Sequence, residues 1–260
     1  MDLSTAAERI GLASGQVQPS RLKEMDAARL TCALLREGRE AGIDQHLLSD
    51  VVEFAASLHK DQKRSWRAGF PKTPYIEHPL RVALRLVRLG VSEPSLIAAA
   101  VLHDTVEDCS KVFVKDYLQM EPGETGECRT LLSQFIEQRY GPTTAEYVLS
   151  VTNPVADKLT HTQYQQNVRE EIATSPKTYL LKFGDFFDNA GSLHYQDREG
   201  NEKMVYRLAS KYYPLISDFE QNLYSVEHLI QSRGSDYIQT SLNKLQTRLV
   251  VILDKYGEAN

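Results

Sequence analysis

Four ionisable residues follow a strongly apolar run near the middle of the chain. The run Leu-Ile-Ala-Ala-Ala-Val-Leu occupies positions 96–102. The next six positions contain four ionisable residues, His103, Asp104, Glu107 and Asp108. On a helix these form two i, i+4 pairs that lie in neighbouring rows on one face. Leaving such charges buried and unpaired is costly, so the pattern indicates a partner. A divalent cation accepts both imidazole and carboxylate ligands, and a solvated helix end is the alternative.

Two further segments could complete a metal site. The segment PYIEHPL (74–80) places His78 beside prolines at the expected start of a helix, and KFGDFFDN (182–189) places Asp185 and Asn189 four residues apart on one helical face. Taken alone, His78 could be structural, and Asp185 and Asn189 could be a satisfied buried pair. Taken together with His103 and Asp104, they supply two imidazoles and two carboxylates. Such a donor set suits manganese, iron, zinc or another divalent cation, with open positions for water.

The elements that must position these residues are expected to be helices, because helical periodicity dominates and no alternating strand pattern is found. The expected helices cover residues 21–42, 44–63, 79–89, 92–108, 129–139, 143–151, 177–193, 201–231 and 235–256. Pro214 is expected to kink or split the eighth of these. The predicted fold class is therefore all-α, with the helix at 177–193 deeply buried.

Length and composition restrict the class of protein. With 260 residues, of which 42% are hydrophobic and 25% charged, the chain is long enough for one large globular domain. The formal net charge of −5 argues against DNA binding and, more mildly, against tRNA. No apolar run reaches the length of a membrane span, so no membrane partner is expected. Three unevenly spaced cysteines, Cys32, Cys109 and Cys128, indicate reduced thiols in the cytoplasm.

Five segments, in their order and spacing, resemble a known family. They are HKDQKR (59–64), PYIEHPL (74–80), AAAVLHDTVED (98–108), Val151-Thr152 and the segment 182–193. They are similar to the HD-domain phosphohydrolases, and within these to the (p)ppGpp hydrolase domains of RelA/SpoT homologues, especially the small hydrolase-only members of the metazoan SpoT-homologue type. HDxxED combined with an upstream YIxHP is specific, whereas a bare His-Asp pair would not be. The likeness runs from about Val51 to about Leu215.

The resemblance implies an HD-domain helical bundle with one metal ion, Mn²⁺ by family habit, in its core. The expected metal ligands are His78, His103, Asp104 and Asp185. The residues expected to position or activate the attacking water are Glu107 and Asp108. The residues expected around the nucleotide are Lys63, Arg64, Tyr75, Asn189 and Ser192. The implied reaction removes pyrophosphate from the 3′ position of (p)ppGpp to give GDP or GTP, so the expected partner is a small nucleotide.

The chain also departs from the family pattern beside two site residues. Phe186 replaces the usual basic residue after the metal-binding aspartate, and Asp188 replaces the usual aromatic residue or histidine before Asn189. These changes leave the expected metal ligands intact but affect the expected guanine preference. The predicted organisation is an N-terminal helical extension (1–45), a hydrolase domain (46–220) and C-terminal helices packing on the core (221–260). The sequence does not fix the oligomeric state.

Two other functions remain open. The first is an HD-type phosphohydrolase that acts on another nucleotide or on pyrophosphorylated tRNA ends. The second is a non-catalytic module that keeps the fold as an alarmone sensor. Retention of Glu107 and Asp108 argues against the sensor, because binding alone does not need a pair that activates water.

Overall fold

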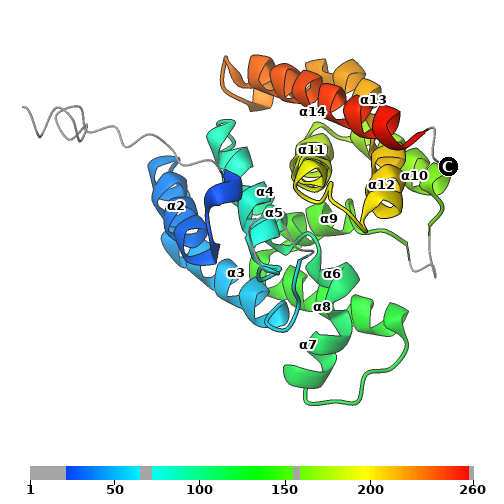
Figure 1. The fold of residues 1–260 in the computed structure, drawn as a ribbon. Coiled ribbons are helices and arrows are strands. Elements are labelled where there is room, and N and C mark those ends of the chain that lie inside the picture. Colours follow the sequence, from blue (N-terminus) through cyan, green and yellow to red (C-terminus); the bar gives the residue numbers. More distant parts are fainter. Residues whose placement is uncertain (1–21, 65–71, 155–158, 258–260) are drawn as a thin grey trace, which may run out of the picture.

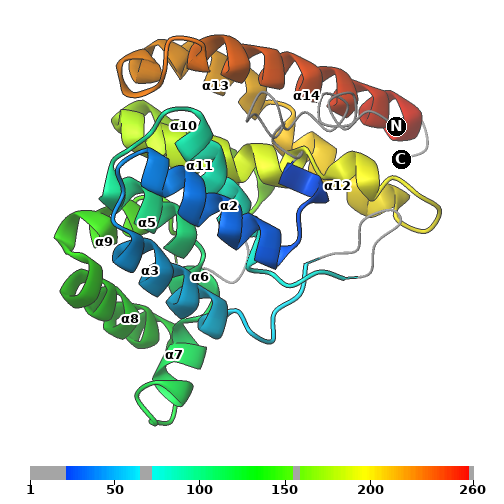
Figure 2. The same ribbon diagram turned by 90° about the vertical axis from the view of Figure 1, so that its left-hand side faces the viewer.

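The computed structural model describes residues 22–64, 72–154 and 159–257, and this part of the chain is a bundle of helices (Figures 1 and 2). In chain order the elements are η2 (Leu22–Glu24), α2 (Ala27–Glu40), α3 (Gln45–Leu58), α4 (Glu77–Arg88), α5 (Pro94–Leu102), α6 (Thr105–Asp108), α7 (Ser110–Asp116), α8 (Thr125–Tyr140), α9 (Pro142–Leu149), α10 (His161–Thr174), α11 (Pro176–Ala190), η3 (Leu193–Tyr195), α12 (Glu202–Tyr212), α13 (Leu215–Asn222), η4 (Leu223–Leu229) and α14 (Gly234–Gly257). Among the described residues the sole β pairing is an isolated bridge between Lys63 and Pro74. The all-α prediction is confirmed.

The site is carried by three central helices, α4, α5 and α11, which pack against one another. Seven consecutive residues of α5, Leu96–Leu102, are buried, as the apolar run predicts. A close approach between α4 and α11 is possible because residue 184 is glycine: a Cβ atom there would lie 2.8 Å from Cγ1 of Val82. Valine is stiff in a helix, so this space could not be regained by a rotamer change.

Helix α4 begins two residues earlier than expected. The predicted start was residue 79, but the helix begins at Glu77, so His78 lies inside its first turn, followed by Pro79. Proline is accepted in a first helical turn because its missing N–H has no partner to lose there. His78 therefore takes its direction from a regular helix and not from a loop.

The expected continuous helix over 92–108 is wrong at one point. The chain forms α5, leaves helical hydrogen bonding at His103 and Asp104, and resumes as α6 at Thr105. The Thr105 hydroxyl donates to the Leu102 carbonyl oxygen at 2.7 Å, and so competes for an acceptor that a continuous helix would use. The break turns His103 and Asp104 into a corner, with Glu107 and Asp108 in the single turn that follows.

Two helices were not predicted, and one predicted helix is divided. Helix α10 has only two buried residues, Val168 and Ile172, so its apolar periodicity is weak, although Thr160 and Gln163 form a capping box before it. Helix α7 is short and also lacks a clear pattern. The expected helix over 201–231 is split at Pro214 into α12 and α13, followed by η4, as the proline predicts.

The outer helices cover this centre. Helix α2 packs on α4, and α14 packs along α12, α13 and η4 on the side that is uppermost in Figures 1 and 2. The division of the chain at residues 45 and 220 stays a prediction. None of the helices in the described ranges is both long enough and apolar enough to cross a membrane.

Candidate metal centre and the adjoining cavities

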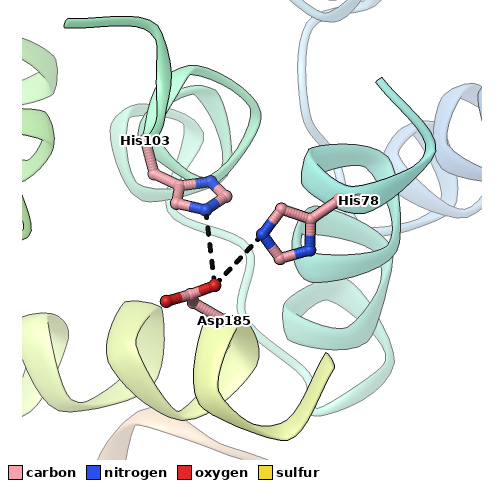
Figure 3. A group of neighbouring side chains, drawn as sticks. All are labelled: His78, His103 and Asp185. Carbon is pink, nitrogen blue, oxygen red and sulfur yellow. Dashed lines mark ion pairs between the residues drawn. The ribbon is translucent and has the colours of Figure 1, made fainter. Parts of the chain in front are cut away.

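Four of the predicted site residues, from three separate segments, converge on one point. His78 comes from α4, His103 from the end of α5, and Asp185 from α11 (Figure 3). Asp104 comes from the corner between His103 and α6. The Nε2 atom of His78 lies 3.0 Å from Asp185 Oδ1 and 3.4 Å from Asp104 Oδ2. The Nε2 atom of His103 lies 3.1 Å from Asp104 Oδ2 and 3.8 Å from Asp185 Oδ1. Both imidazoles are buried and both carboxylates are partly exposed.

The hydrogen bonds of the opposite ring nitrogens decide what these two Nε2 atoms offer. His103 Nδ1 lies 3.0 Å from the Ala100 carbonyl oxygen, and His78 Nδ1 lies 2.8 Å from Asp188 Oδ2. Both partners can only accept, so each Nδ1 carries the hydrogen. In the neutral rings, Nε2 then presents a lone pair toward carboxylate oxygens that are also acceptors. A cation between them would satisfy all of these groups, which is how second-partner hydrogen bonds orient metal-binding histidines.

An independent geometric observation fits the same conclusion. His78 Nε2 and His103 Nε2 are buried, and neither makes a hydrogen bond with any described group. His78, His103 and Asp185 each offer a ligand atom, and these atoms all lie within 4.8 Å of one another. Buried polar atoms normally find partners, so the two orphaned nitrogens fit a divalent metal ion at this point. Asp104 Oδ2 lies beside the cluster and also accepts a hydrogen bond from the Tyr75 hydroxyl at 2.8 Å.

Without a cation, the carboxylates and imidazoles strongly influence one another. Burial favours the neutral imidazole of His103, but the Asp104 and Asp185 carboxylates outweigh burial and hold its pKa well above the usual value. Burial likewise favours the protonated form of Asp185, but the two histidines hold its pKa below the usual range. The site is therefore preorganised to keep positive charge among these four groups.

Asp188, which the sequence analysis treated as a departure, lies behind His78. Its carboxylate accepts from His78 Nδ1, from Arg81 Nε at 2.9 Å and Nη2 at 3.1 Å, and pairs with Lys23 Nζ at 2.7 Å. Asp188 is fully buried. Burial raises its pKa, but the Arg81 and Lys23 charges and the His78 hydrogen bond hold the pKa well below its usual range. Asp188 thus fixes the tautomer and the direction of the His78 ring.

The predicted water-activating pair lines the same cavity as the candidate ligands. Glu107 accepts from the backbone N–H of Asn153 at 2.9 Å and from its side-chain amide at 3.0 Å. Burial raises the pKa of Glu107, the charges of Asp104 and Asp108 add to this, and the Asn153 hydrogen bonds oppose it. Asp108 accepts from Gln62 Nε2 at 2.9 Å, and burial also raises its pKa.

The four candidate ligands His78, His103, Asp104 and Asp185 form what we call the metal corner. Tyr75, Arg64 and Asn189 connect it to a second cavity. The Arg64 guanidinium donates to Asn189 Oδ1 at 2.7 Å and lies 5.4 Å from the centre of the Tyr75 ring. Asn189 in turn donates to Asp185 Oδ1 at 2.5 Å. Because Tyr75 also donates to Asp104, both partners of Arg64 touch a candidate metal ligand.

Two adjoining cavities meet at these residues. The cavity at the metal corner has a volume of about 160 Å³ and contains the acidic residues. The neighbouring cavity has a volume of about 260 Å³ and is lined by Lys63 and Arg64 together with apolar side chains that include Leu208. Tyr75, Asn189 and Tyr212 line both. An acidic end that can hold a cation thus adjoins a basic and partly apolar end.

Lys63 and Ser192 take more peripheral positions. Lys63 is exposed at the rim of the larger cavity. Ser192 lines the same cavity, but its hydroxyl donates to the Asp188 carbonyl oxygen at 2.6 Å and accepts from Lys23. Its hydrogen is therefore committed within the protein. Ten of the eleven predicted site residues line one or both of the two cavities, and His78 lies buried beside them, 3.0 Å from Asp185. Their individual roles stay predictions.

Several residues of the site were not predicted from the sequence. Apart from Asp188 and its cationic partners, they are Gln62, Asn153, Tyr164, Lys182, Lys211 and Tyr212. Lys182 is held by Glu171 at 2.7 Å and the Val151 carbonyl oxygen at 2.9 Å, which indicates a structural position. Lys211 lies 3.5 Å from the centre of the Tyr164 ring at the cavity wall, and burial lowers its pKa. Arg81 alone had a local signal, because it lies one helical turn after His78.

Comparison with known proteins finds relatives that share one activity in their names. A protein of Aquifex aeolicus named guanosine-3′,5′-bis(diphosphate) 3′-pyrophosphohydrolase is 32% identical over 167 residues, which cover 64% of this chain and 20% of that protein. Two proteins named guanosine-3′,5′-bis(diphosphate) 3′-pyrophosphohydrolase MESH1 also match. The one from Danio rerio is 30% identical over 155 residues, and the one from Mus musculus is 41% identical over 154 residues.

The extent of these matches differs between the relatives. Each MESH1 match covers 59% of this chain and 73% of the relative. The chain spans only about a fifth of the length of the Aquifex protein, at 20%. No protein-family model matches the chain.

Proposed function

The chain belongs to the family of the MESH1 guanosine-3′,5′-bis(diphosphate) 3′-pyrophosphohydrolases, and we propose that it hydrolyses (p)ppGpp. The reaction adds water to the phosphorus atom bonded to the 3′ oxygen and breaks that bond, which releases pyrophosphate and leaves GDP or GTP. The observation that carries the proposal is the pair of buried, unpartnered imidazole nitrogens of His78 and His103, which face two carboxylates at the floor of a cavity. A basic cavity of suitable size for part of a nucleotide adjoins it.

His78, His103, Asp104 and Asp185 would hold the metal, which we propose to be Mn²⁺. Imidazole and carboxylate donors suit this ion as well as other divalent cations. When bound, the ion supplies Lewis-acid stabilisation of phosphate oxygens and a lower pKa for water. Asp188 contributes by keeping the hydrogen of His78 on Nδ1, so that Nε2 stays available as a donor atom.

Glu107 is the proposed general base. It lines the cavity beside the candidate ligands, and its raised pKa lies closer to neutral pH than that of an ordinary glutamate. A base is most effective when its pKa approaches the operating pH. Asn153 holds the carboxylate in a fixed direction through two hydrogen bonds, so that it need not reorganise when it accepts the proton of water. Asp108, held by Gln62, positions the same water.

The basic cavity would bind the rest of the nucleotide. Lys63 and Arg64 supply positive charge for phosphate oxygens, and the guanidinium offers the forked donor geometry that phosphates favour. Tyr75 and Tyr212 provide ring faces, and Asn189 provides an amide near the position of a ribose. Ser192 can only accept there, because its hydrogen is donated to Asp188. The net charge of −5 favours a small nucleotide over nucleic acid, and a cytoplasmic location fits that substrate.

Incubating the full chain with ppGpp and Mn²⁺ tests the proposal. We expect equimolar pyrophosphate and GDP, separated and quantified by ion-exchange chromatography, and loss of both products after chelation and in Asp104→Ala. A deoxynucleoside monophosphate and a pyrophosphorylated tRNA end serve as comparison substrates. Turnover of either one without turnover of ppGpp would favour another HD-type phosphohydrolase. Tight ppGpp binding without any product, in protein shown to contain metal, would favour an alarmone sensor.

A further inference from the structure

A third cavity lies on the other side of α11 from the metal corner. It has a volume of about 760 Å³, and its walls come from η2, the C-terminal end of α4, the segment 231–233 and one face of α14, with one residue each from α11 and η3. No described residue lines both this cavity and either of the two cavities at the metal corner. It is therefore a separate space, and the proposed hydrolysis gives it no role.

The walls of this cavity are strongly cationic. Six basic side chains line it, and none of its described lining residues is acidic: the six are Lys23, Arg85, Arg88, Arg233, Lys244 and Arg248. Arg88 has a carboxylate partner in Glu37, at 2.8 and 2.9 Å. Within the described ranges, the side chains of Arg233, Lys244 and Arg248 form no ion pair or hydrogen bond. So much positive charge around one concave space raises the local concentration of anions.

Arg85 provides a second observation that points to a ligand. Its side chain is 4% exposed, and its Nε atom has no hydrogen-bond partner among the described groups. Its other contacts are long, at 3.4 Å to the Gly184 carbonyl oxygen and 3.9 Å to Asp188 Oδ1. A buried N–H without an acceptor is costly and rare. An anionic acceptor in the cavity would satisfy it.

Aromatic side chains add apolar surface beside these cations. Phe187, Tyr195 and Tyr237 line the cavity, and the Arg85 guanidinium lies 5.0 Å from the centre of the Phe187 ring. Tyr237 is 47% exposed and is available for stacking. Fixed guanidinium groups are well matched to phosphate oxygens, and ring faces are well matched to a purine.

We propose that this cavity binds a phosphate-chain anion, either a nucleoside polyphosphate or an inorganic polyphosphate. Binding of the anion would also affect the metal corner. Lys23 and Arg85 line the cavity, and their side chains lie 2.7 and 3.9 Å from Asp188 Oδ1. Asp188 in turn accepts from the ring of His78. A bound anion would share these cations with Asp188 and so alter the hydrogen bond that directs His78.

Isothermal titration calorimetry of the full, metal-free chain with inorganic tripolyphosphate tests the site. The test variant is Lys244→Glu/Arg248→Glu, which reverses two exposed charges on α14. The matched control is Lys111→Glu/Lys115→Glu, which changes the net charge equally at two exposed positions of α7. We expect wild type and control to bind alike and the test variant to bind at least about tenfold more weakly. Equal weakening in both variants, or in neither, would overturn the proposal.

Two additional measurements show whether the ligand is a nucleotide or an inorganic polyphosphate, and whether its binding affects His78. GTP binding more tightly than tripolyphosphate, with the gain lost in Tyr237→Ala, would assign the site to a nucleotide, and equal affinities would assign it to an inorganic chain. In the same titration, NMR of ¹⁵N-labelled histidine should show the His78 ring signals shifting with the calorimetric Kd. Binding that leaves these signals unmoved would overturn the link to the metal corner. Neither measurement requires turnover, so failure of the hydrolase proposal would not affect the outcome.

Discussion

Two aspartates one turn apart on α11 lie in opposite surroundings. Asp185 is partly exposed at the cavity, where its carboxylate faces two imidazole nitrogens that lack hydrogen bonds. Asp188 is fully buried and accepts from His78, Arg81 and Lys23. The first carboxylate has unused capacity facing a space, whereas the second has all its capacity filled by the protein.

The difference shows how one helix can provide both a binding group and its support. A carboxylate that is saturated inside the protein cannot bind a ligand, but it can hold a neighbouring ring in one orientation. A carboxylate that is left incompletely paired is less favourable for folding and remains available for a cation. Substitutions at Asp185 should therefore affect metal binding, and substitutions at Asp188 should affect stability.

The largest expected effect is on metal binding and turnover in Asp185→Asn. The amide keeps the shape of the side chain but removes the negative charge, so we expect the metal to be lost and turnover to fall by roughly 10³-fold. The melting temperature should stay close to that of wild type, because Asp185 is partly exposed. Elemental analysis, ppGpp turnover and thermal melting measure the three quantities. Full metal occupancy in the variant would contradict the assignment of Asp185 as a ligand.

The matching change at the buried aspartate, Asp188→Asn, should mainly lower the stability of the fold. It removes the negative charge that the buried Arg81 and the partly buried Lys23 face, and of the described carboxylates only Glu77, at 3.4 Å, then remains beside Arg81, so we expect the free energy of unfolding to fall by about 3–5 kcal/mol. Denaturant titration measures this. Asp197→Asn is the control, since it removes a partly exposed carboxylate that pairs with the exposed Lys255 and accepts from Tyr256, and it should cost clearly less than Asp188→Asn. If the two variants are equally stable, the hydrogen bonds and ion pairs of Asp188 do not stabilise the fold more than those of Asp197.

Glu107 lies between these two extremes, because it is partly exposed, like Asp185, but its carboxylate is held by hydrogen bonds from Asn153. In Glu107→Gln we expect the metal content to be unchanged and kcat to fall by about 10²-fold or more, since the amide cannot accept a proton. Glu137→Gln, at an exposed position of α8, should leave both quantities unchanged. Wild-type turnover in Glu107→Gln would show that another group is the base.

The smallest expected effect is a change in pH dependence in Asn153→Ala. The Asn153 hydrogen bonds favour the ionised form of Glu107, so removing the side-chain bond should raise the pKa of Glu107 further. A base works only when it is deprotonated, so activity should begin to fall at a higher pH than in wild type as the solution is acidified. The pH profile of kcat/KM measures this limb. A shift toward lower pH would contradict the sign of the argument.

The sequence predicted four candidate metal ligands that lie close together in the structure, but not the way they are held. His103, Asp104, His78 and Asp185 stood out because ionisable residues within apolar helices are rare. The break at His103 was missed, because the Thr105 hydroxyl bond that accompanies it leaves no trace in apolar periodicity. Helix α10 was missed for a related reason: its polar surface hides the period of its two buried residues.

The contacts of Asp188 with Arg81 and Lys23 could not be predicted from the sequence for a different reason. Its partners Arg81 and Lys23 lie 107 and 165 residues away along the chain, so their contacts depend on the tertiary packing of α11 against α4 and η2. A pattern within one segment carries no information about such pairs. Of the two residues that depart from the family pattern, Phe186 and Asp188, it is Asp188 whose contacts only the structure reveals.

The contact of Gly184 with Val82 has a consequence for how this centre could be altered. His78 lies on α4 and Asp185 on α11, and these two helices meet at Gly184. The distance between the two candidate ligands therefore depends on a residue that has no side chain. One added methyl group would act as a spacer and lengthen that span while every donor atom remained in the chain. A substitution at residue 184 would thus change how well a cation fits between the candidate ligands without replacing any of them.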